Sequence, residues 1–377
     1  MKIEPFAVEQ WMNEYENHCE YNLAETCVES LTVDELLTLT GVGRSALDAI
    51  LEMKLTYGAI VGSDRLRAAV AALYDTVAPE NVLATHGAIG ANKLVHETLI
   101  EPGDRVISVQ PTYQQHYSIP ASYGADIQIL TLRADNGYLP DLDELRSLAA
   151  DNTTLIAINN PNNPTGSLMD AAMLTEIGEI AASCDAHVLC DEVYRGTNQL
   201  GSGSSASIVD VYDKGISTAS MSKAFSLAGL RLGWMAAPIV VIKAAELHRD
   251  YSTISIGMIN DFLATIALEH ADVVLERSRH ITRTNLAILS DWVDAEPRIS
   301  WVKPQAGTTA LLHYDAHVAS RDFCKQLLDE TGVLFMPGSA LEVEGSVRIG
   351  YANNEQVLRD GLPHVSRFLG DCLARLV

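Results

Sequence analysis

Short apolar runs alternate with stretches of helical periodicity between residues 81 and 237. The runs are rich in Val, Ile and Leu, which is typical of strands that are buried on both faces of a parallel sheet. Stretches with helical spacing lie between them, at 90–99, 142–150 and 171–183. This alternation predicts an α/β domain with a largely parallel sheet of about seven strands. We expect these strands at 82–85, 106–109, 127–132, 155–159, 187–190, 216–219 and 232–236.

The pattern changes after residue 240. Helical periodicity continues through 276 and on to 294, and strand-like runs follow at 310–313, 333–336 and 346–349 before a final helix from Glu355. A chain of 377 residues is too long for one small core. We therefore expect a large domain from residues 38–275, and a smaller α/β domain from residues 1–37 together with 276–377.

Composition narrows the possible partners. The formal net charge is −23, whereas nucleic-acid binding requires a basic patch, so we expect no nucleic-acid partner. No stretch approaches the roughly 20 apolar residues of a membrane helix, so we expect a cytoplasmic protein. The six cysteines have no metal-like spacing and are expected to be reduced and mostly buried, although Cys27 could lie at the mouth of a site.

A lysine directly follows one of the predicted buried strands, in the segment Ser220-Met-Ser-Lys223. Burial lowers the pKa of a lysine, and the neutral amine is the nucleophile that forms imines with carbonyl compounds. The alternative is a loop lysine that extends to the surface, and Lys223 alone would favour it.

Two other predicted strands end in polar side chains. Strand 187–190 runs into Asp191 and, three residues later, Tyr194, while strand 155–159 runs into a Pro- and Gly-containing turn around Asn163. The turn could be a tight loop and nothing more. However, ligands of open α/β sheets bind at the carboxyl ends of the strands, where these side chains and Lys223 would meet.

This ordered set of motifs resembles the class I/II aminotransferases, which are fold-type I pyridoxal-phosphate enzymes. The Asn-Asn-Pro-Thr-Gly turn, the Asp-x-x-Tyr strand end and the Ser-x-Ser-Lys segment with a following Gly-Leu-Arg-x-Gly all occur in order, and the resemblance covers nearly the whole chain. It implies a fold-type I structure with a pyridoxal 5′-phosphate cofactor joined to Lys223 as a Schiff base. The implied reaction transfers the α-amino group of an amino acid to a 2-oxo acid.

The resemblance assigns catalytic and ring-binding roles. Lys223, Asp191 and Tyr194 would be catalytic, with Asp191 paired to the pyridinium nitrogen. Asn163 and Tyr194 would bond the phenolic oxygen of the ring, and Asn163 would also contact the substrate. Tyr113 would stack on the ring face, with a core tyrosine as the alternative.

The resemblance also assigns the phosphate site. Ser220, Arg231 and the backbone amides of Ala88 and Ile89 would hold the phosphate, and these two amides open a predicted helix whose free N–H groups suit an anion. Ser222 could join them or could be a small residue beside the lysine.

Two more positions concern the substrate and a second subunit. Arg348 would grip the substrate α-carboxylate, because a guanidinium offers two parallel donors. Tyr57 matches a tyrosine that reaches the phosphate of the neighbouring subunit, which implies a homodimer with shared active sites.

The N-terminal segment departs from the family pattern. Glu25 lies where many relatives carry a small or neutral group, and we expect it to favour a substrate with a cationic side chain. The segment is also faintly similar to a cyclising member of the fold type, so a lyase, cyclase or racemase acting on an amino acid stays open as the alternative reaction. His313 and His317 are interpreted as strand-end histidines, and no metal is expected.

Overall fold

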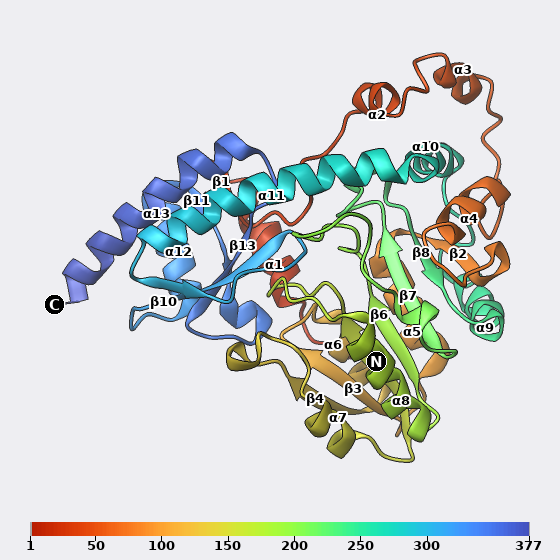
Figure 1. The fold of residues 1–377 in the computed structure, drawn as a ribbon, viewed down its shortest axis with the longest axis horizontal. Coiled ribbons are helices and arrows are strands. Elements are labelled where there is room, and N and C mark those ends of the chain that lie inside the picture. The colour runs from red at the N-terminus through yellow and green to blue at the C-terminus, as the bar shows by residue number, and fades with distance from the viewer. Residues whose placement is uncertain (1, 377) are drawn as a thin grey trace.

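The protein is built from two lobes that share one long helix. The structure, a computed structural model, describes residues 2–376, with side chains through Asp371. The larger lobe holds a seven-stranded sheet and the smaller lobe a four-stranded sheet. Helix α11 (Ala271–Ala295) runs along the top of both lobes in Figure 1.

The large sheet confirms the predicted fold class. Its strands have the order β2-β8-β7-β6-β5-β3-β4, and each lies where the apolar pattern predicts it. All neighbours are parallel except β8, which is antiparallel to both β2 and β7. The strands are β2 (Val82–Thr85), β3 (Arg105–Gln110), β4 (Asp126–Thr131), β5 (Thr153–Asn159), β6 (His187–Asp191), β7 (Gly215–Ser220) and β8 (Gly233–Ala236).

Helices cover both faces of this sheet. Alternate residues of β5 point to opposite sides: Leu155 packs in the core beneath α5 (Gly87–Leu99) and α9 (Ile239–Arg249), while Ile156 packs in the core beneath α7 (Leu142–Leu148) and α8 (Ala171–Ser183). Burial on both faces explains why these strands read as continuous apolar runs. Other large-lobe helices are α4 (Asp64–Ala71), α6 (Gln115–Tyr123) and α10 (Met258–Glu269).

The small lobe has its own core and an antiparallel sheet of order β12-β13-β10-β9. The expected strand at 333–336 is wrong as a single element, because the chain divides at Phe335 into two short strands. β11 pairs with β1, whereas β12 pairs with β13. The elements are β1 (Tyr21–Asn22), β9 (Ile299–Trp301), β10 (Thr309–Tyr314), α12 (Ser320–Thr331), β11 (Val333–Leu334), β12 (Met336–Pro337), β13 (Ser346–Gly350) and α13 (Glu355–Leu376).

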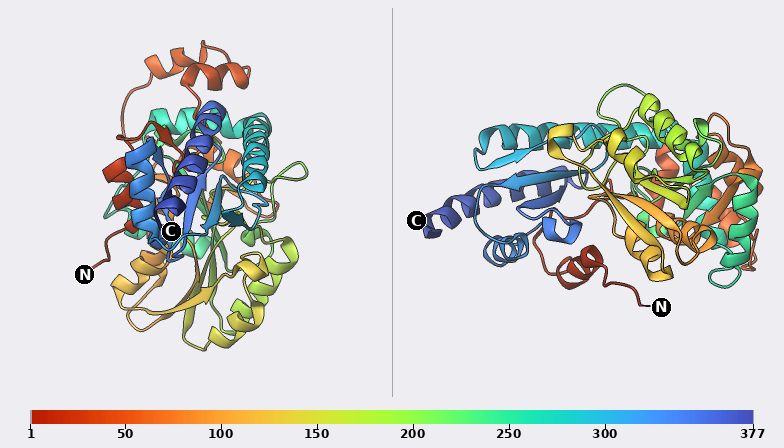
Figure 2. Two further views of the ribbon diagram at one scale, coloured as in Figure 1. Left: turned by 90° about the vertical axis from the view of Figure 1, so that its left-hand side faces the viewer. Right: turned by 90° about the horizontal axis from the view of Figure 1, so that it is seen from below.

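The N-terminal helix α1 (Ala7–Tyr15) lies between the lobes (Figure 2). Trp11 is fully buried in the small-lobe core, and its Nε1 donates to the Phe335 carbonyl oxygen at 2.8 Å. At the other end of the helix, the Ala7 N–H donates to Oε1 of Gln114 in the large lobe at 2.8 Å. The helix therefore contacts both lobes directly.

The predicted domain limits stay a prediction. Strands β2 to β8 fall within residues 38–275 and β9 to β13 within 276–377, but α11 runs through the boundary. Helices α2 (Val33–Leu39) and α3 (Ala46–Leu51) project away from the large lobe in Figure 1 and in the left view of Figure 2. Within residues 2–376 no helix is long and apolar enough to cross a bilayer.

A glycine in β8 allows the sheet and helix α5 to approach closely. A Cβ on Gly233 would lie 2.4 Å from the Gly87 carbonyl carbon and 2.6 Å from the Ala88 nitrogen. Because these are backbone atoms, we predict that Gly233→Ala lowers the free energy of unfolding by about 1–3 kcal/mol. Gly229→Ala is the control, since nothing lies within 4 Å of its added Cβ, and we expect a change within about 0.5 kcal/mol. Denaturant unfolding of both variants is the measurement, and equal stability would contradict the close packing.

Candidate active site

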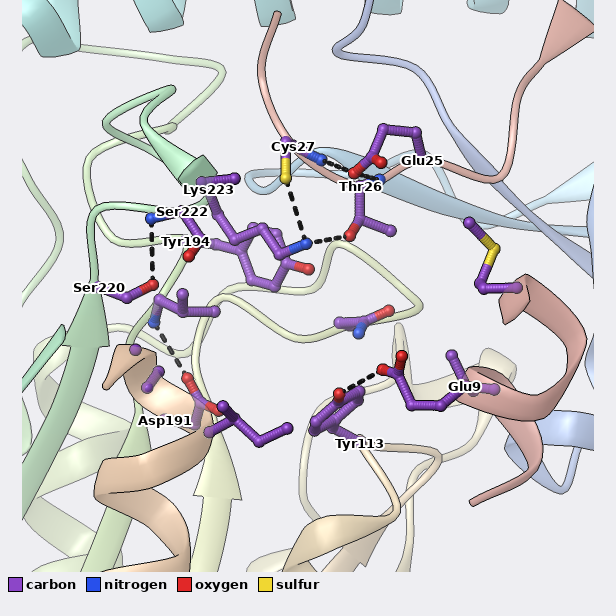
Figure 3. A pocket seen from close by; sticks show the side chains of 18 of the residues that line it. Glu9, Glu25, Thr26, Cys27, Tyr113, Asp191, Tyr194, Ser220, Ser222 and Lys223 are labelled. Carbon is purple, nitrogen blue, oxygen red and sulfur yellow. Dashed lines mark hydrogen bonds between the residues drawn. The ribbon is translucent and has the colours of Figure 1, made fainter. Parts of the chain in front are cut away.

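A cavity of about 300 Å³ lies at the carboxyl edge of the large sheet, bounded by the small lobe and α1 (Figure 3). The structure brings every predicted site residue except Tyr57 to this cavity. The predicted residues that line it are Glu25, Ala88, Ile89, Tyr113, Asn163, Asp191, Tyr194, Ser220, Ser222, Lys223, Arg231 and Arg348.

Lys223 points into the cavity from the segment after β7. Its Nζ donates hydrogen bonds to Thr26 Oγ1 and, at 3.5 Å, to Cys27 Sγ. Burial by itself lowers the pKa of Lys223, but the negative charges that Cys27 and Tyr194 carry at the high pH where this amine titrates, together with the charge of Glu25, raise it above its usual range. The expected lowering of this pKa is therefore wrong, because charge attraction outweighs desolvation.

Asp191 is held in one orientation at the end of β6. Its Oδ2 accepts a hydrogen bond from Asn92 Nδ2 at 2.8 Å, and its Oδ1 accepts one from the Val193 N–H at 3.1 Å. Thr218 Oγ1 in turn donates to Asn92 Oδ1. His116 Nε2 lies 3.5 Å from Asp191 Oδ2. This carboxylate is positioned to pair with a cation inside the cavity.

Arg348 projects from β13 and is only 2% exposed, which excludes a surface role. Its Nη1 donates to Asn163 Oδ1 at 3.2 Å and its Nη2 donates to the Ala24 carbonyl oxygen at 3.1 Å. Its Nε has no hydrogen-bond partner among the side chains and backbone groups that the structure describes. Burial lowers the pKa of this guanidinium. A buried cation with a free donor is costly unless an anion pairs with it, so Arg348 fits a carboxylate ligand.

One end of the cavity is built for an anion. Helix α5 begins at Gly87, whose φ of +70° turns the chain so that the amides of Ala88 and Ile89 open the helix. The Arg231 guanidinium lies beside this turn, since a Cβ on Gly87 would be 3.4 Å from Arg231 Nη2. Arg231 Nη1 also donates to Ser222 Oγ at 3.5 Å. Free helix N–H groups, a guanidinium and hydroxyls together suit a phosphate.

Two tyrosines lie within the cavity. Tyr194 is 2% exposed, and burial raises its pKa although Lys223 and Arg348 partly oppose that shift. Tyr113 donates its hydroxyl to Glu9 Oε1 at 2.6 Å. Burial, with the charge of Glu9, raises the pKa of Tyr113. Both phenols therefore stay protonated at neutral pH.

The hydrogen bonding of Glu25 and the exposure of Cys27 differ from what the sequence predicts. Glu25 Oε1 accepts hydrogen bonds from the N–H groups of Thr26 at 2.8 Å and Cys27 at 2.9 Å, so the carboxylate is engaged with its own loop. Burial by itself raises the pKa of Glu25, but Lys223 and these hydrogen bonds outweigh it and the net pKa is lowered. The expected burial of Cys27 is wrong, because its partly exposed side chain lines the cavity.

Tyr57 lies outside the cavity and is 70% exposed. Its predicted contact is with the site of a second subunit, so that role stays a prediction.

Sequence reasoning missed several cavity residues. Asn92 lies one helical turn after Ala88, so its spacing from an assigned residue was an available signal. Thr26, Glu9, Met12 and Glu16 carried no such signal. They reach the cavity because α1 and the following segment fold over its open side.

The donor set fits pyridoxal phosphate. The α5 turn and Arg231 suit its phosphate, Asp191 suits a protonated ring nitrogen, and Lys223 is an amine within the same cavity. The Nε of Arg348, which has no hydrogen-bond partner among the described residues, is a free donor in the same cavity.

Comparisons with known proteins agree with this fit. The family described as Aminotransferase class I and II matches residues 31–362. Capreomycidine synthase of Streptomyces vinaceus is 31% identical, covering 96% of this chain and 93% of its own length. A solved pyridoxal-phosphate-dependent aminotransferase from Streptococcus suis 89-1591 is 44% identical with a TM-score of 0.95, covering 99% of each chain.

A second solved structure, the pyridoxal-phosphate-dependent cyclase OrfR, is 26% identical with a TM-score of 0.91 and covers 98% of each chain. The similarity to these proteins spans both lobes and all the cavity elements. This chain is therefore an enzyme of the class I and II aminotransferase family, with the fold-type I structure and the pyridoxal 5′-phosphate cofactor of that family.

Proposed function

We propose that this enzyme transfers the α-amino group of an amino acid to a 2-oxo acid. The observation that carries the proposal is the convergence of Lys223, Asp191 and Arg348 on one cavity. An amine, a fixed carboxylate and a buried guanidinium with a free donor are the groups needed to bind the cofactor and an α-amino acid together.

The cofactor's chemistry defines the task of the surrounding residues. Pyridoxal phosphate, when bound, supplies an aldehyde that condenses with amines and a pyridinium ring that delocalises a carbanion's electrons. We assign Asp191 to the ring nitrogen, Asn163 and Tyr194 to the phenolic oxygen, and Tyr113 to the ring face. The phosphate is assigned to Ser220, Ser222, Arg231 and the amides of Ala88 and Ile89. The fixed position of Asp191 supports the first assignment, since its two oxygens are already held by Asn92 and Val193.

Arg348 and Lys223 act on the substrate. Arg348 presents Nε and Nη groups to the α-carboxylate, and Asn163 steadies the guanidinium through its Oδ1. Lys223 Nζ is placed to take the α-proton as general base and to return it. The Thr26 hydroxyl accepts a hydrogen bond from Nζ and so directs the amine within the cavity.

We further propose a homodimer in which Tyr57 reaches the phosphate site of the second subunit. Exposed apolar side chains support an interface near this residue. Leu51 is 82% exposed, Leu55 73% and Tyr251 98%. Ser255 Oγ donates to the Tyr57 carbonyl oxygen, so the segments bearing Tyr57 and Tyr251 lie close together. Such exposure is unusual unless a partner covers the surface.

A cyclase, lyase or racemase is the second candidate, and the similarity to capreomycidine synthase and to the cyclase OrfR favours a cyclase. The cofactor contacts are the same in both cases. The reactions differ in whether a 2-oxo acid must accept the amino group before the enzyme can turn over again.

That difference gives the test of function. We predict that cofactor-loaded enzyme, mixed with an amino acid substrate and no 2-oxo acid, releases about one keto acid per active site and then stops. Adding a 2-oxo acid should restart the release, because the amino group then has an acceptor. Mass spectrometry of the products over time is the measurement. Continued turnover without any acceptor would contradict amino transfer and favour the second candidate.

The raised pKa of Lys223 generates a prediction about cofactor capture. Below that pKa the neutral amine fraction grows about tenfold per pH unit, so the rate of pyridoxal-phosphate uptake should rise steadily between pH 6 and 9. Glu25→Gln removes one negative charge near Lys223 while keeping an acceptor for Thr26 and Cys27. We therefore expect faster uptake by this variant at every pH. Stopped-flow absorbance measures the rate, and a flat pH profile would contradict the assignment of charge to Lys223.

A further inference from the structure

We propose that the substrate carries a positively charged group at the end of its side chain, and that Glu9 and Glu16 bind this group. The inference rests on the proposed function and adds a substrate class and two specificity-determining residues. It differs from the expectation for Glu25, because Glu9 and Glu16 come from the N-terminal helix.

Glu9 lies in α1 and Glu16 is the C-cap residue that follows this helix, and both line the same cavity as Arg348. Glu9, Met12 and Glu16 are three and four residues apart, which is the spacing of neighbours on a helix surface. Glu9 points from this helix toward the cavity and Tyr113 in Figure 3. The buried Nε of Arg348, which has no partner, marks where the substrate α-carboxylate would lie in that cavity.

The opposite face of α1 is fixed, so the acidic face cannot turn away. Trp11 is buried in the small-lobe core, and its Nε1 is hydrogen-bonded to the Phe335 carbonyl oxygen. The Arg321 guanidinium also lies over the Trp11 ring, 5.1 Å from its centroid. Glu9 and Glu16 are therefore held at the cavity by packing.

The other charges of the cavity pair with one another or with the cofactor. Arg231 faces the phosphate site, Asp191 faces the site of the ring nitrogen, and Arg348 is reserved for the α-carboxylate. Glu25 is engaged by its own backbone and lies near Lys223. Glu9 also lies within electrostatic reach of Arg348. Once Arg348 pairs with the α-carboxylate, no other cationic side chain among the described residues that line the cavity remains for Glu9 and Glu16.

The two remaining carboxylates have free acceptor capacity. Glu9 uses Oε1 to accept from Tyr113, and the Glu16 carboxylate makes no hydrogen bond or ion pair among the described residues. Both side chains are half-buried, where an uncompensated charge is costly. A guanidinium or ammonium would compensate them, whereas an acidic side chain would be repelled. Met12, between them, offers an apolar surface for methylene groups.

The test compares ligands that differ in charge but little in shape. L-arginine is paired with neutral L-citrulline, and L-lysine with neutral L-norleucine. Dissociation constants are measured by calorimetry on cofactor-loaded Lys223→Ala protein, and kcat and KM are measured on the unmodified holoenzyme. We expect the cationic member of at least one pair to bind about tenfold tighter or more. Equal binding within both pairs would overturn the proposal.

Single substitutions identify the carboxylates that bind the cationic group of the substrate. Glu9→Gln keeps an acceptor for Tyr113 and Glu16→Gln keeps the side-chain size, so neither variant should unfold. Because each loses one negative charge, each should reduce the preference for the cationic ligand by about fivefold or more. Glu14→Gln is the matched control, because this residue lies on the same helix with a side chain that is 55% exposed. Glu14→Gln should leave the preference unchanged. The preference for cationic ligands could instead be lost in Glu25→Gln and kept in Glu9→Gln and Glu16→Gln. That result would make Glu25 the carboxylate that binds the cationic group and would overturn the proposal.

The binding measurement separates this inference from the proposed function. Arg348→Gln should weaken all four ligands while keeping the ratio within each pair. If the enzyme shows the cationic preference but turns over without a 2-oxo acid, amino transfer fails and the assignment of Glu9 and Glu16 stands. If amino transfer is found but no preference exists, only the assignment fails.

Discussion

The site depends on the hydrogen-bonded register of three neighbouring parallel strands. In β5, β6 and β7, Asn159 pairs with Asp191, and Asp191 pairs with Thr218. This register places the turn that carries Asn163, the carboxylate of Asp191 and the segment that carries Lys223 at one edge of the sheet. Because a slip of one residue would turn Asp191 to the opposite face, the buried apolar faces that fix the register also fix the chemistry.

The small lobe and the N-terminal segment enclose the cavity that begins at the edge of the large sheet. The Glu25–Cys27 segment packs directly on β13, where a Cβ on Gly350 would lie 1.7 Å from the Glu25 carbonyl oxygen. That contact brings Thr26 to Lys223 and leaves Arg348, two residues before Gly350, facing the same cavity. Helix α1 then closes the remaining side. In the proposed assignment the sheet supports the cofactor, while segments distant in sequence meet the substrate.

This division explains how much could be predicted from the sequence. The strands of the large sheet and the residues at their ends follow from local apolar patterns and ordered motifs, and the predicted fold class was confirmed. Contacts between distant segments left no local signal: Glu9 meets Tyr113 only in the folded chain, and Lys223 gains anionic neighbours that reverse its expected pKa shift. The division of residues 333–336 was likewise missed, because its two halves pair with different strands that are distant in the sequence.

The central claim is that Lys223 is the amine that holds the cofactor. Borohydride reduction of the cofactor-loaded protein, followed by peptide mass spectrometry, tests it most directly, because reduction turns an imine into a stable bond. The account predicts a pyridoxyl-phosphate adduct on the peptide that contains Lys223 and none on surface lysines such as Lys93, whose side chain is 50% exposed. A loaded protein that gives no adduct on Lys223 would contradict the account.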